Sequence, residues 1–506
     1  MRARSDAPRW ILAGSILGSG AVFLESTVAT VALPAIGRAL GLGVAGLQWV
    51  MNGYLLTLGA LMLLGGALGD RFPRGRVLAV GLVAFAVASA ACAAATGAVW
   101  LVACRVAQGA AGALVAPNSL AIVETTFAGE ARGAAIGRWA AWTAVFTAIG
   151  PFLGGWLVDA ASWRWVFATI PPFALAAAWI VARHARATDS STDRGDGAAR
   201  GPVDVAGALL ATLGLAGIVG ALTLAPDAGA SSPLVTGGAL GGVAALAAFV
   251  LVERRAAHPL LPLGVFRSRQ FTGANATTLL VYAALGALMF LLMLELQDAL
   301  GYDALAAGAT LLPVNALMLL LSPRVGRLAQ RIGARLPMAL GAGIAAVGML
   351  LFARVHPGGR FVDTVLPAVV VFGLGLSVLV APLTAAVLGA VSDELAGVAS
   401  GINNAVARLG GLLATAAIPL AAGLGGSRAP RGAALTVGFA RAMWMCAALC
   451  AAGGLIAWLT VGRARPGPRQ EGVQGAPAAG AAQRAEAPAP RATFSPRVGA
   501  RRTPRP

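Results

Sequence analysis

The chain has 506 residues, of which 58% are hydrophobic and only 11% are charged. A soluble domain of this size needs more polar surface, so the composition excludes a soluble globular protein and indicates an all-α protein that crosses a membrane many times. The net charge of +18 does not indicate nucleic-acid binding, because the basic residues are all arginines, scattered between apolar runs and through the C-terminal tail. Anionic lipid headgroups are the counterpart that we expect for them.

A helix that spans the hydrocarbon core needs about 20 apolar residues. By this criterion the sequence predicts fourteen membrane helices, near residues 10–32, 47–68, 77–96, 99–123, 134–158, 164–182, 203–224, 234–252, 271–298, 304–322, 336–353, 364–391, 398–423 and 437–461. They form an N-terminal six-helix bundle (10–182), two extra central helices (203–252) and a C-terminal six-helix bundle (271–461). The other segments are the N-terminus (1–9), a polar linker (183–202), a basic connector (253–270) and a tail (462–506) whose composition predicts disorder.

The placement of arginines predicts the orientation in the membrane. Most arginines between the predicted helices fall in alternate loops, which the positive-inside rule assigns to the cytoplasm. The basic N-terminus leads directly into a full-length span, so we expect no cleaved signal peptide. The sequence thus predicts a multi-pass protein of the plasma (inner) membrane, with both termini, the linker and the connector in the cytoplasm.

The first predicted helix contains FLESTVATVALP, with Glu25 well inside the apolar run. An ionisable group at that depth is costly and by default faces a cavity or a partner. A buried carboxylate can bind and release a proton, so Glu25 is a candidate for proton coupling. The alternative is a carboxylate held by one structural hydrogen bond.

Residues 66–76, GALGDRFPRGR, place one acid among three arginines after the second helix. The positions of interest are Gly66, Asp70, Arg71, Arg74 and Arg76. Residues 326–335, GRLAQRIGAR, repeat the pattern in a corresponding loop with Gly326, Arg331, Gly333 and Arg335. An offset of 260 positions aligns Arg71 with Arg331 and also Gly150 with Gly410. Two copies indicate a duplicated membrane protein, although each alone could be a plain charged turn.

The fourth helix carries Arg105, with Gln108 nearly one turn further along. An arginine at membrane depth must be paired, because it does not lose its proton. Arg105 could therefore tune the carboxylate that titrates, or it could only lock two helices together.

Near the end of the fifth helix, residues 150–155 read GPFLGG. This motif contains Gly150, Pro151, Gly154 and Gly155. Proline and glycine allow a neighbouring backbone to approach and to slide, so we predict a hinge or a sliding seam. A kink without functional consequence is the alternative.

Several motifs together resemble the major facilitator superfamily. Residues 66–76 resemble its signature between helices two and three, the Arg105 segment resembles its fourth-helix motif, and GPFLGG resembles a fifth-helix motif associated with antiporters. Glu25 stands where the drug-exporting branch usually has Asp. Three further segments are similar to the fourteen-helix drug:proton antiporters: SWRWVF (162–167), LELQDALGYDALAAGATLLP (294–313) and LAGVASGINNAVARLGG (395–411). The resemblance covers residues 10–461.

This resemblance implies a proton-coupled secondary transporter that exports amphipathic or cationic small molecules by alternating access, of the multidrug or antibiotic-efflux type. It also implies that residues 66–76 act as a latch, with Asp70 closing onto the adjacent bundle in the outward-open state. Pro73 and Gly75 depart from the family pattern, which predicts a weaker latch. We expect an acidic cavity whose nearby aromatics would contact a cation, namely Trp142, Phe146 and Tyr282.

In the second half, Glu295 occupies a slot that is commonly an uncharged aromatic in the family, whereas Gln297 fits the family pattern. Glu295 is therefore a second candidate for a proton or cation site, with an acid near the outer water interface as the alternative. Arg408, in the thirteenth helix, is another cation that needs a partner. The end of a neighbouring helix would be a sufficient partner. The candidate coupling and substrate residues are Glu25, Arg105, Gln108, Glu295 and Gln297.

The sequence predicts no enzyme, because no nucleophile–base set lies at membrane depth. It also predicts no metal site, since the cysteines lie in apolar runs without histidine or acid neighbours. We expect a monomer whose partners are a small-molecule substrate, lipid, and the proton as coupling ion, with no other cofactor. Two alternatives remain open. One is a metabolite exporter or importer of the same fold, and the other is a non-transporting membrane scaffold or sensor, for which costly intramembrane charges would have little use.

Overall fold

The structure, a computed structural model, describes residues 7–185, 204–255, 262–392, 395–426 and 432–462. All of them belong to one compact unit, residues 1–464. Most of the predicted N-terminus, linker and tail, and the middle of the predicted connector, lie outside the described residues.

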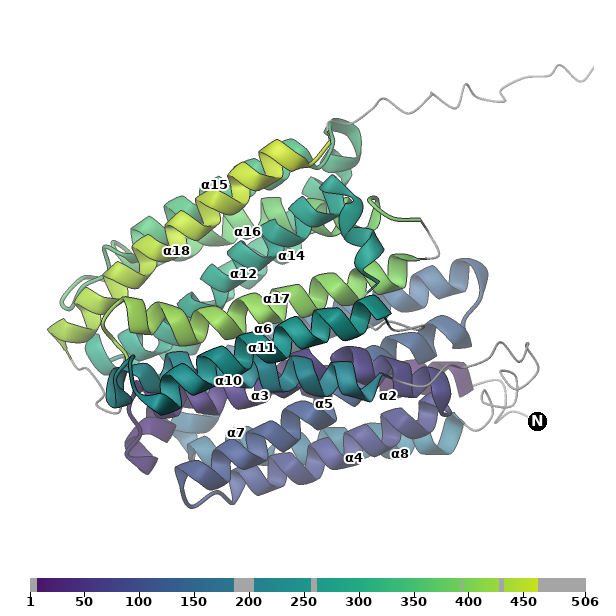
Figure 1. Cartoon of the computed structure of the whole chain (residues 1–506), viewed down its shortest axis with the longest axis horizontal. Helices are drawn as coiled ribbons and strands as arrows, with labels where there is room; N and C mark the ends of the chain where they lie inside the picture. Colours follow the sequence, from purple (N-terminus) through teal and green to yellow (C-terminus); the bar gives the residue numbers. More distant parts are fainter. Residues whose placement is uncertain (1–6, 186–203, 256–261, 393–394, 427–431, 463–506) are drawn as a thin grey trace, which may run out of the picture. The chain divides into compact units, whose positions relative to one another are not determined.

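Fourteen spans cross the described unit (Figure 1). They are formed by α2 (Ala7–Leu40), α3 (Val44–Arg71), α4 (Arg74–Ala93), α5 (Ala98–Thr126), α6 (Gly129–Ala160), α7 (Trp163–Ala168) with α8 (Ile170–His184), α10 (Val205–Ala228), α11 (Pro233–Arg255), α12 (Arg269–Leu294) with the π-helical turn η2 (Glu295–Ala299), α13 (Ala304–Ala309) with α14 (Leu312–Ile332), α15 (Arg335–Phe352), α16 (Val365–Leu388), α17 (Ala396–Ala421) and α18 (Ala433–Thr460). A 3₁₀ turn, η1 (Leu263–Arg267), precedes α12. No strand occurs in the described ranges, and the predicted all-α, fourteen-helix fold is confirmed.

The two repeated segments are mostly helical, in contrast to the predicted loops. α3 continues to Arg71, and only Phe72 and Pro73 separate it from α4. α14 continues to Ile332 and ends where Gly333 adopts a φ of 87°, a left-handed conformation that glycine tolerates. The arginines of both segments therefore lie at helix ends. The helical backbone there stays hydrogen-bonded close to the membrane boundary.

The two six-helix bundles repeat the same packing scheme. In the N-terminal bundle, the contacting pairs are α2–α6, α2–α8, α3–α5, α4–α5 and α4–α8. In the C-terminal bundle, the corresponding pairs are α12–α17, α12–α18, α14–α16, α15–α16 and α15–α18. This one-to-one correspondence is what a duplicated six-helix unit should show, and it agrees with the sequence offset.

The extra helices α10 and α11 pack against each other, and α10 also contacts α3 and α17, one from each bundle. Close packing of the pair depends on glycine, because a Cβ on Gly217 would lie 2.6 Å from the carbonyl oxygen of Gly238. An apolar cluster then joins α10 to both bundles through Leu56, Leu215 and Leu412. The extra pair therefore covers the α3–α17 contact from outside.

Large apolar side chains are exposed along the helices, as a protein surrounded by lipid requires. Examples from different helices are Val80, Val99, Trp179, Leu213, Leu240, Leu319, Trp444 and Leu455. In water such a surface would drive association, so the fold itself indicates a membrane protein.

Candidate functional site

The centre of the N-terminal bundle holds a fully buried ion pair between Glu25 of α2 and Arg105 of α5. The Nη1 atom of Arg105 donates to Oε1 of Glu25 and also to Oε1 of Gln108 at 2.7 Å. Its Nε donates to the carbonyl oxygen of Val50 on α3 at 3.0 Å. Three residues predicted from the sequence as functional therefore lie in one network.

Aromatic and hydroxyl side chains complete this network. The Tyr54 ring of α3 stacks against the guanidinium of Arg105, with the Arg105 carbon Cζ 4.3 Å from the ring centroid. Gln108 donates to the Ser89 hydroxyl of α4 at 3.1 Å, and that hydroxyl donates to the Phe167 carbonyl at 2.9 Å. Five helices contribute to this network, so a change at the ion pair would alter the packing of the whole bundle.

One oxygen and one nitrogen of the ion pair have no partner in the described part of the chain. They are Oε2 of Glu25 and Nη2 of Arg105. Both side chains are fully buried, so the pair does not line an open surface in this conformation. The Glu25 carboxylate is therefore enclosed and faces a cation in this conformation, and the expected acidic cavity with Trp142, Phe146 and Tyr282 nearby stays a prediction.

Glu295 and Gln297 lie away from this network, in the π-helical turn η2. Glu295 is fully buried and accepts a hydrogen bond from the Thr436 hydroxyl of α18 at 2.7 Å, whereas its Oε2 has no partner within the described ranges. Gln297 points to the other bundle and donates to the carbonyl oxygen of Val31 on α2 at 2.9 Å. π-helical turns often occur at functional sites, and this one touches both bundles.

Consecutive helices alternate in direction, so the described unit has two ends, which we call the Leu40 end and the Asp70 end. Polar contacts between the bundles lie in the half of the unit towards the Leu40 end. Arg38 pairs with Asp298 at 2.7 Å, and the Asp159 carboxylate of α6 accepts from the backbone N–H of Leu305 at 2.7 Å. Gln48 of α3 donates to the Thr415 carbonyl of α17 at 2.7 Å.

The GPFLGG motif forms a tight seam at the Leu40 end. A Cβ on Gly150 or Gly154 would collide with α2, at Thr27 and Val28 respectively. A Cβ on Gly155 would collide with the carbonyl oxygen of Ala304 in α13. Reciprocally, α13 approaches the carbonyl oxygen of Pro151 through Gly308. The motif thus brings the backbones of α2, α6 and α13 together, which favours a seam between the bundles over a local kink.

At the Asp70 end, the side-chain hydrogen bonds and ion pairs of the motif at residues 66–76 stay within its own bundle among described residues. Asp70 pairs with Arg74 at 2.6 Å, and Arg74 also donates to the Ala121 carbonyl of α5 at 3.3 Å. Gly66 faces α5, and the exposed side chains of Arg71 and Arg76 have no ion-pair partner in the described ranges. Asp70 therefore does not bridge to the other bundle in this conformation.

Two departures from the family pattern have a packing explanation. Gly75 lies against the Cβ of Ala185, so a larger side chain would push α4 away from the end of α8. Pro73 is the N-cap residue of α4 in a connection of two residues.

The second copy at residues 326–335 is not equivalent in charge, because Gln330 stands where the offset of 260 places Asp70. Arg335 stacks on Trp458 at 4.2 Å instead of pairing with an acid, and Arg331 is exposed. Gly326 faces Ala381 of α16, as Gly66 faces α5.

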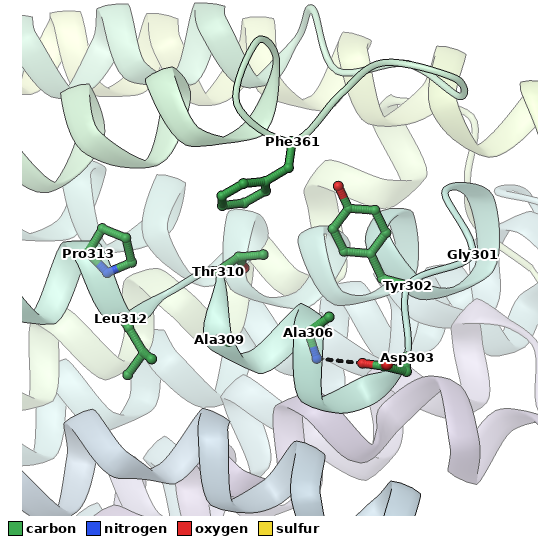
Figure 2. Close-up of a pocket in the computed structure, with 9 residues that line it drawn as sticks. All are labelled: Gly301, Tyr302, Asp303, Ala306, Ala309, Thr310, Leu312, Pro313 and Phe361. Carbon is green, nitrogen blue, oxygen red and sulfur yellow. Dashed lines mark hydrogen bonds between the residues drawn. The ribbon is translucent and has the colours of Figure 1, made fainter.

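A cavity of about 710 Å³ lies at the Leu40 end between the start of α13–α14 and the loop that follows α15 (Figure 2). The rings of Tyr302 and Phe361 point into it, and the Asp303 carboxylate caps α13 by accepting from the N–H of Ala306 at 2.6 Å. None of the residues predicted as functional lines it.

Comparisons with known proteins agree with these features. The sequence model of the Major Facilitator Superfamily matches residues 15–415. The chain is 36% identical over 398 residues to the uncharacterized MFS-type transporter EfpA of Mycobacterium tuberculosis, covering 78% of this chain and 73% of that protein. It is 34% identical over 398 residues to the tetracenomycin C resistance and export protein of Streptomyces glaucescens, covering 78% and 72%. It is 35% identical over 421 residues to the puromycin resistance protein pur8 of Streptomyces alboniger, covering 81% of each.

Among solved structures, the POT family transporter PepTSo shares the fold. The match has a TM-score of 0.63 and covers 90% of this chain and 97% of that chain. Sequence identity is 15%, so this likeness concerns the fold alone.

Proposed function

The chain belongs to the Major Facilitator Superfamily, and on that premise we propose that it is a proton-coupled transporter that exports amphipathic small molecules by alternating access. It is a multi-pass membrane protein, and its relatives include proteins named for antibiotic resistance and export. The proposal places it in the plasma membrane with both termini in the cytoplasm, so that the Asp70 end faces the cytoplasm.

The buried pair of Glu25 and Arg105 is the observation that carries the proposal. A pair of this kind contributes little net stability compared with apolar residues of similar size, so a purely structural role would not explain it well. Oε2 of Glu25 has no donor in the described part of the chain, so a proton can bind there without displacing a hydrogen bond. Protonation would remove the negative charge opposite Arg105, which would still donate to Val50 and Gln108.

Helix α2 connects this pair to the contacts between the bundles. It carries Glu25 at its centre, and further along it carries Val31, which accepts from Gln297, and Arg38, which pairs with Asp298. A change in how α2 is held against α5 therefore acts directly on the closure at the Leu40 end. Protonated and deprotonated Glu25 would favour different facing states, and the same equilibrium would move the substrate.

On the proposed orientation, this conformation is closed towards the outside. The contacts of Arg38, Asp159 and Gln48 join the bundles at the Leu40 end, and Asp70 is paired with Arg74 in its own bundle. In the opposite state, Asp70 would release Arg74 and close onto the other bundle. Glu25 is enclosed and paired with Arg105 in this conformation, so it presents no open negative charge to a cationic substrate.

The test uses everted membrane vesicles with an imposed acid-inside gradient and Nile red, an uncharged amphiphile. The wild type should accumulate Nile red in exchange for protons, and Glu25→Gln should abolish this accumulation. Glu25→Asp is the matched control, because it keeps the carboxylate and should retain activity. Equal accumulation by the wild type and Glu25→Gln at every pH would contradict proton coupling through Glu25. Movement of Nile red in the same direction as the protons would favour the importer alternative.

A further inference from the structure

A second arginine inside the membrane has no counter-charge among the residues that the structure describes. Arg408 lies on α17 and faces α3, with its Cβ 3.6 Å from the position that a Cβ on Gly59 would take. Its Nε is buried without a hydrogen-bond partner, and no ion pair joins it to any residue that the structure describes. Because arginine does not lose its charge, this guanidinium needs an anion from elsewhere.

The facing wall of α3 carries a second unsatisfied group, Asn52. Positions 48, 52 and 59 of α3 lie on one side of the helix, since they are separated by four and seven residues. Gln48 and Gly59 both meet α17, so Asn52 between them lies on the same contact side. Asn52 is fully buried, and neither its Oδ1 nor its Nδ2 has a partner among described residues. Buried polar groups are normally hydrogen-bonded, so the α3–α17 interface lacks something that would satisfy both helices.

The other charges of the described unit do not compensate Arg408. Glu25 is neutralised by Arg105, and Asp70 pairs with Arg74. Glu295 is held by Thr436 at the Leu40 end. The middle of the α3–α17 interface therefore has a net positive charge in a low-dielectric region, where an anion is attracted strongly.

We propose that Arg408 binds the anionic group of an amphipathic ligand at the α3–α17 interface, and that Asn52 hydrogen-bonds to the polar body of that ligand. Carboxylate, sulfonate and phosphate groups all fit, because a guanidinium can donate two parallel hydrogen bonds to each of them. Seven residues of helix separate Asn52 from Gly59, about 10 Å at 1.5 Å per residue, which matches a molecule with two polar ends and an apolar middle. This inference rests on the proposed function, since it adds anionic amphiphiles to the small molecules that the protein exports.

The experiment measures binding to the full-length protein in nanodiscs of zwitterionic lipid, without a proton gradient. Naphthalenesulfonate and naphthyl-trimethylammonium are the probes, because they share an aromatic ring and carry permanent charges of opposite sign. Arg408→Gln should weaken naphthalenesulfonate binding at least about tenfold, the expected size for a lost charge-assisted hydrogen bond. Arg408→Lys should lose less, because it keeps the charge. Neither variant should weaken binding of the cationic probe.

Arg335→Gln is the matched control, since it removes the same charge from an arginine that stacks on Trp458 away from α3. It should leave naphthalenesulfonate binding unchanged. Equal affinity of the wild type and Arg408→Gln, or the absence of saturable naphthalenesulfonate binding, would overturn the proposal. A monodisperse elution profile shows that a loss does not come from misfolding.

A further arm distinguishes a dissolved substrate from a lipid headgroup. Adding anionic phosphatidylglycerol to the nanodiscs should not reduce naphthalenesulfonate affinity if the site takes dissolved substrates. Competition that disappears in Arg408→Gln would retain the anion site and assign it to lipid phosphate. Binding through Arg408 without any proton-driven Nile red transport would overturn the proposed function and leave the anion site standing.

Discussion

A double-mutant cycle on Glu25 and Arg105 tests whether the buried network has the energetics that its geometry implies. Each single change, Glu25→Gln or Arg105→Met, leaves one uncompensated charge in a site that excludes solvent completely. Breaking a buried pair in this way costs about 3–5 kcal/mol in the free energy of unfolding. The double variant leaves a neutral amide and a thioether, and Gln108 still donates to Ser89. We expect it to lie within about 2 kcal/mol of the wild type, the cost of a buried amide without a full set of partners.

The assay is chemical unfolding of the purified protein followed by tryptophan fluorescence, with the slope against denaturant checked for each variant. Asp70→Asn serves as the control, because the Asp70–Arg74 pair is largely exposed and such pairs contribute about 0–1 kcal/mol. Additive destabilisation, with the double variant about 6–10 kcal/mol below the wild type, would refute a direct pair. The double variant also separates two causes of lost transport, since it should restore stability without restoring a proton-binding carboxylate.

Two further predictions concern the two ends of the unit. Gly308→Ala should disfavour the state closed at the Leu40 end by about 1–3 kcal/mol, because its Cβ would collide with the Pro151 carbonyl. The measurement is the labelling of a cysteine placed at Ala304, which should increase. Unchanged labelling would contradict the tight seam between α6 and α13. Asp70→Asn should slow Nile red transport, because Asp70 acts as a latch in the other facing state. It should change the free energy of unfolding by less than about 1 kcal/mol. A normal transport rate would count against any gating role of Asp70.

The charged members of the network were predictable from the sequence. Glu25 and Arg105 each stand out because an ionisable group in an apolar run is expensive, and Gln108 follows Arg105 by nearly one turn. The sequence left two roles open for Arg105, and the pairing with Glu25 across 80 positions required the packing of α2 against α5. The helix count was predictable for a similar reason, because every span must satisfy its own backbone within an apolar run.

Neutral members of the site were not predictable in the same way. Tyr54, Ser89 and Thr436 are ordinary residues in apolar helices, and only tertiary packing brings them to Arg105 and Glu295. Asp159 resembles any acid near a helix end, although it accepts hydrogen bonds from the start of α13 in the other bundle. Whether Glu25 faces a cavity depends on the conformation, which a linear pattern does not specify.

Helix α3 connects the two sites that the charges define. Its Tyr54 stacks on Arg105, and Gly59, five positions further along, faces Arg408. An anion that draws Arg408 towards α3 therefore acts on the helix that also holds Arg105, through the Val50 carbonyl and the Tyr54 ring. Coupling between two binding events is reciprocal, so an anion that changes proton affinity at Glu25 must have its own affinity changed by protonation by the same factor. Comparing naphthalenesulfonate affinity at two pH values would therefore measure whether α3 transmits between Arg408 and Glu25, and a pH-independent affinity would mean that the two sites are independent.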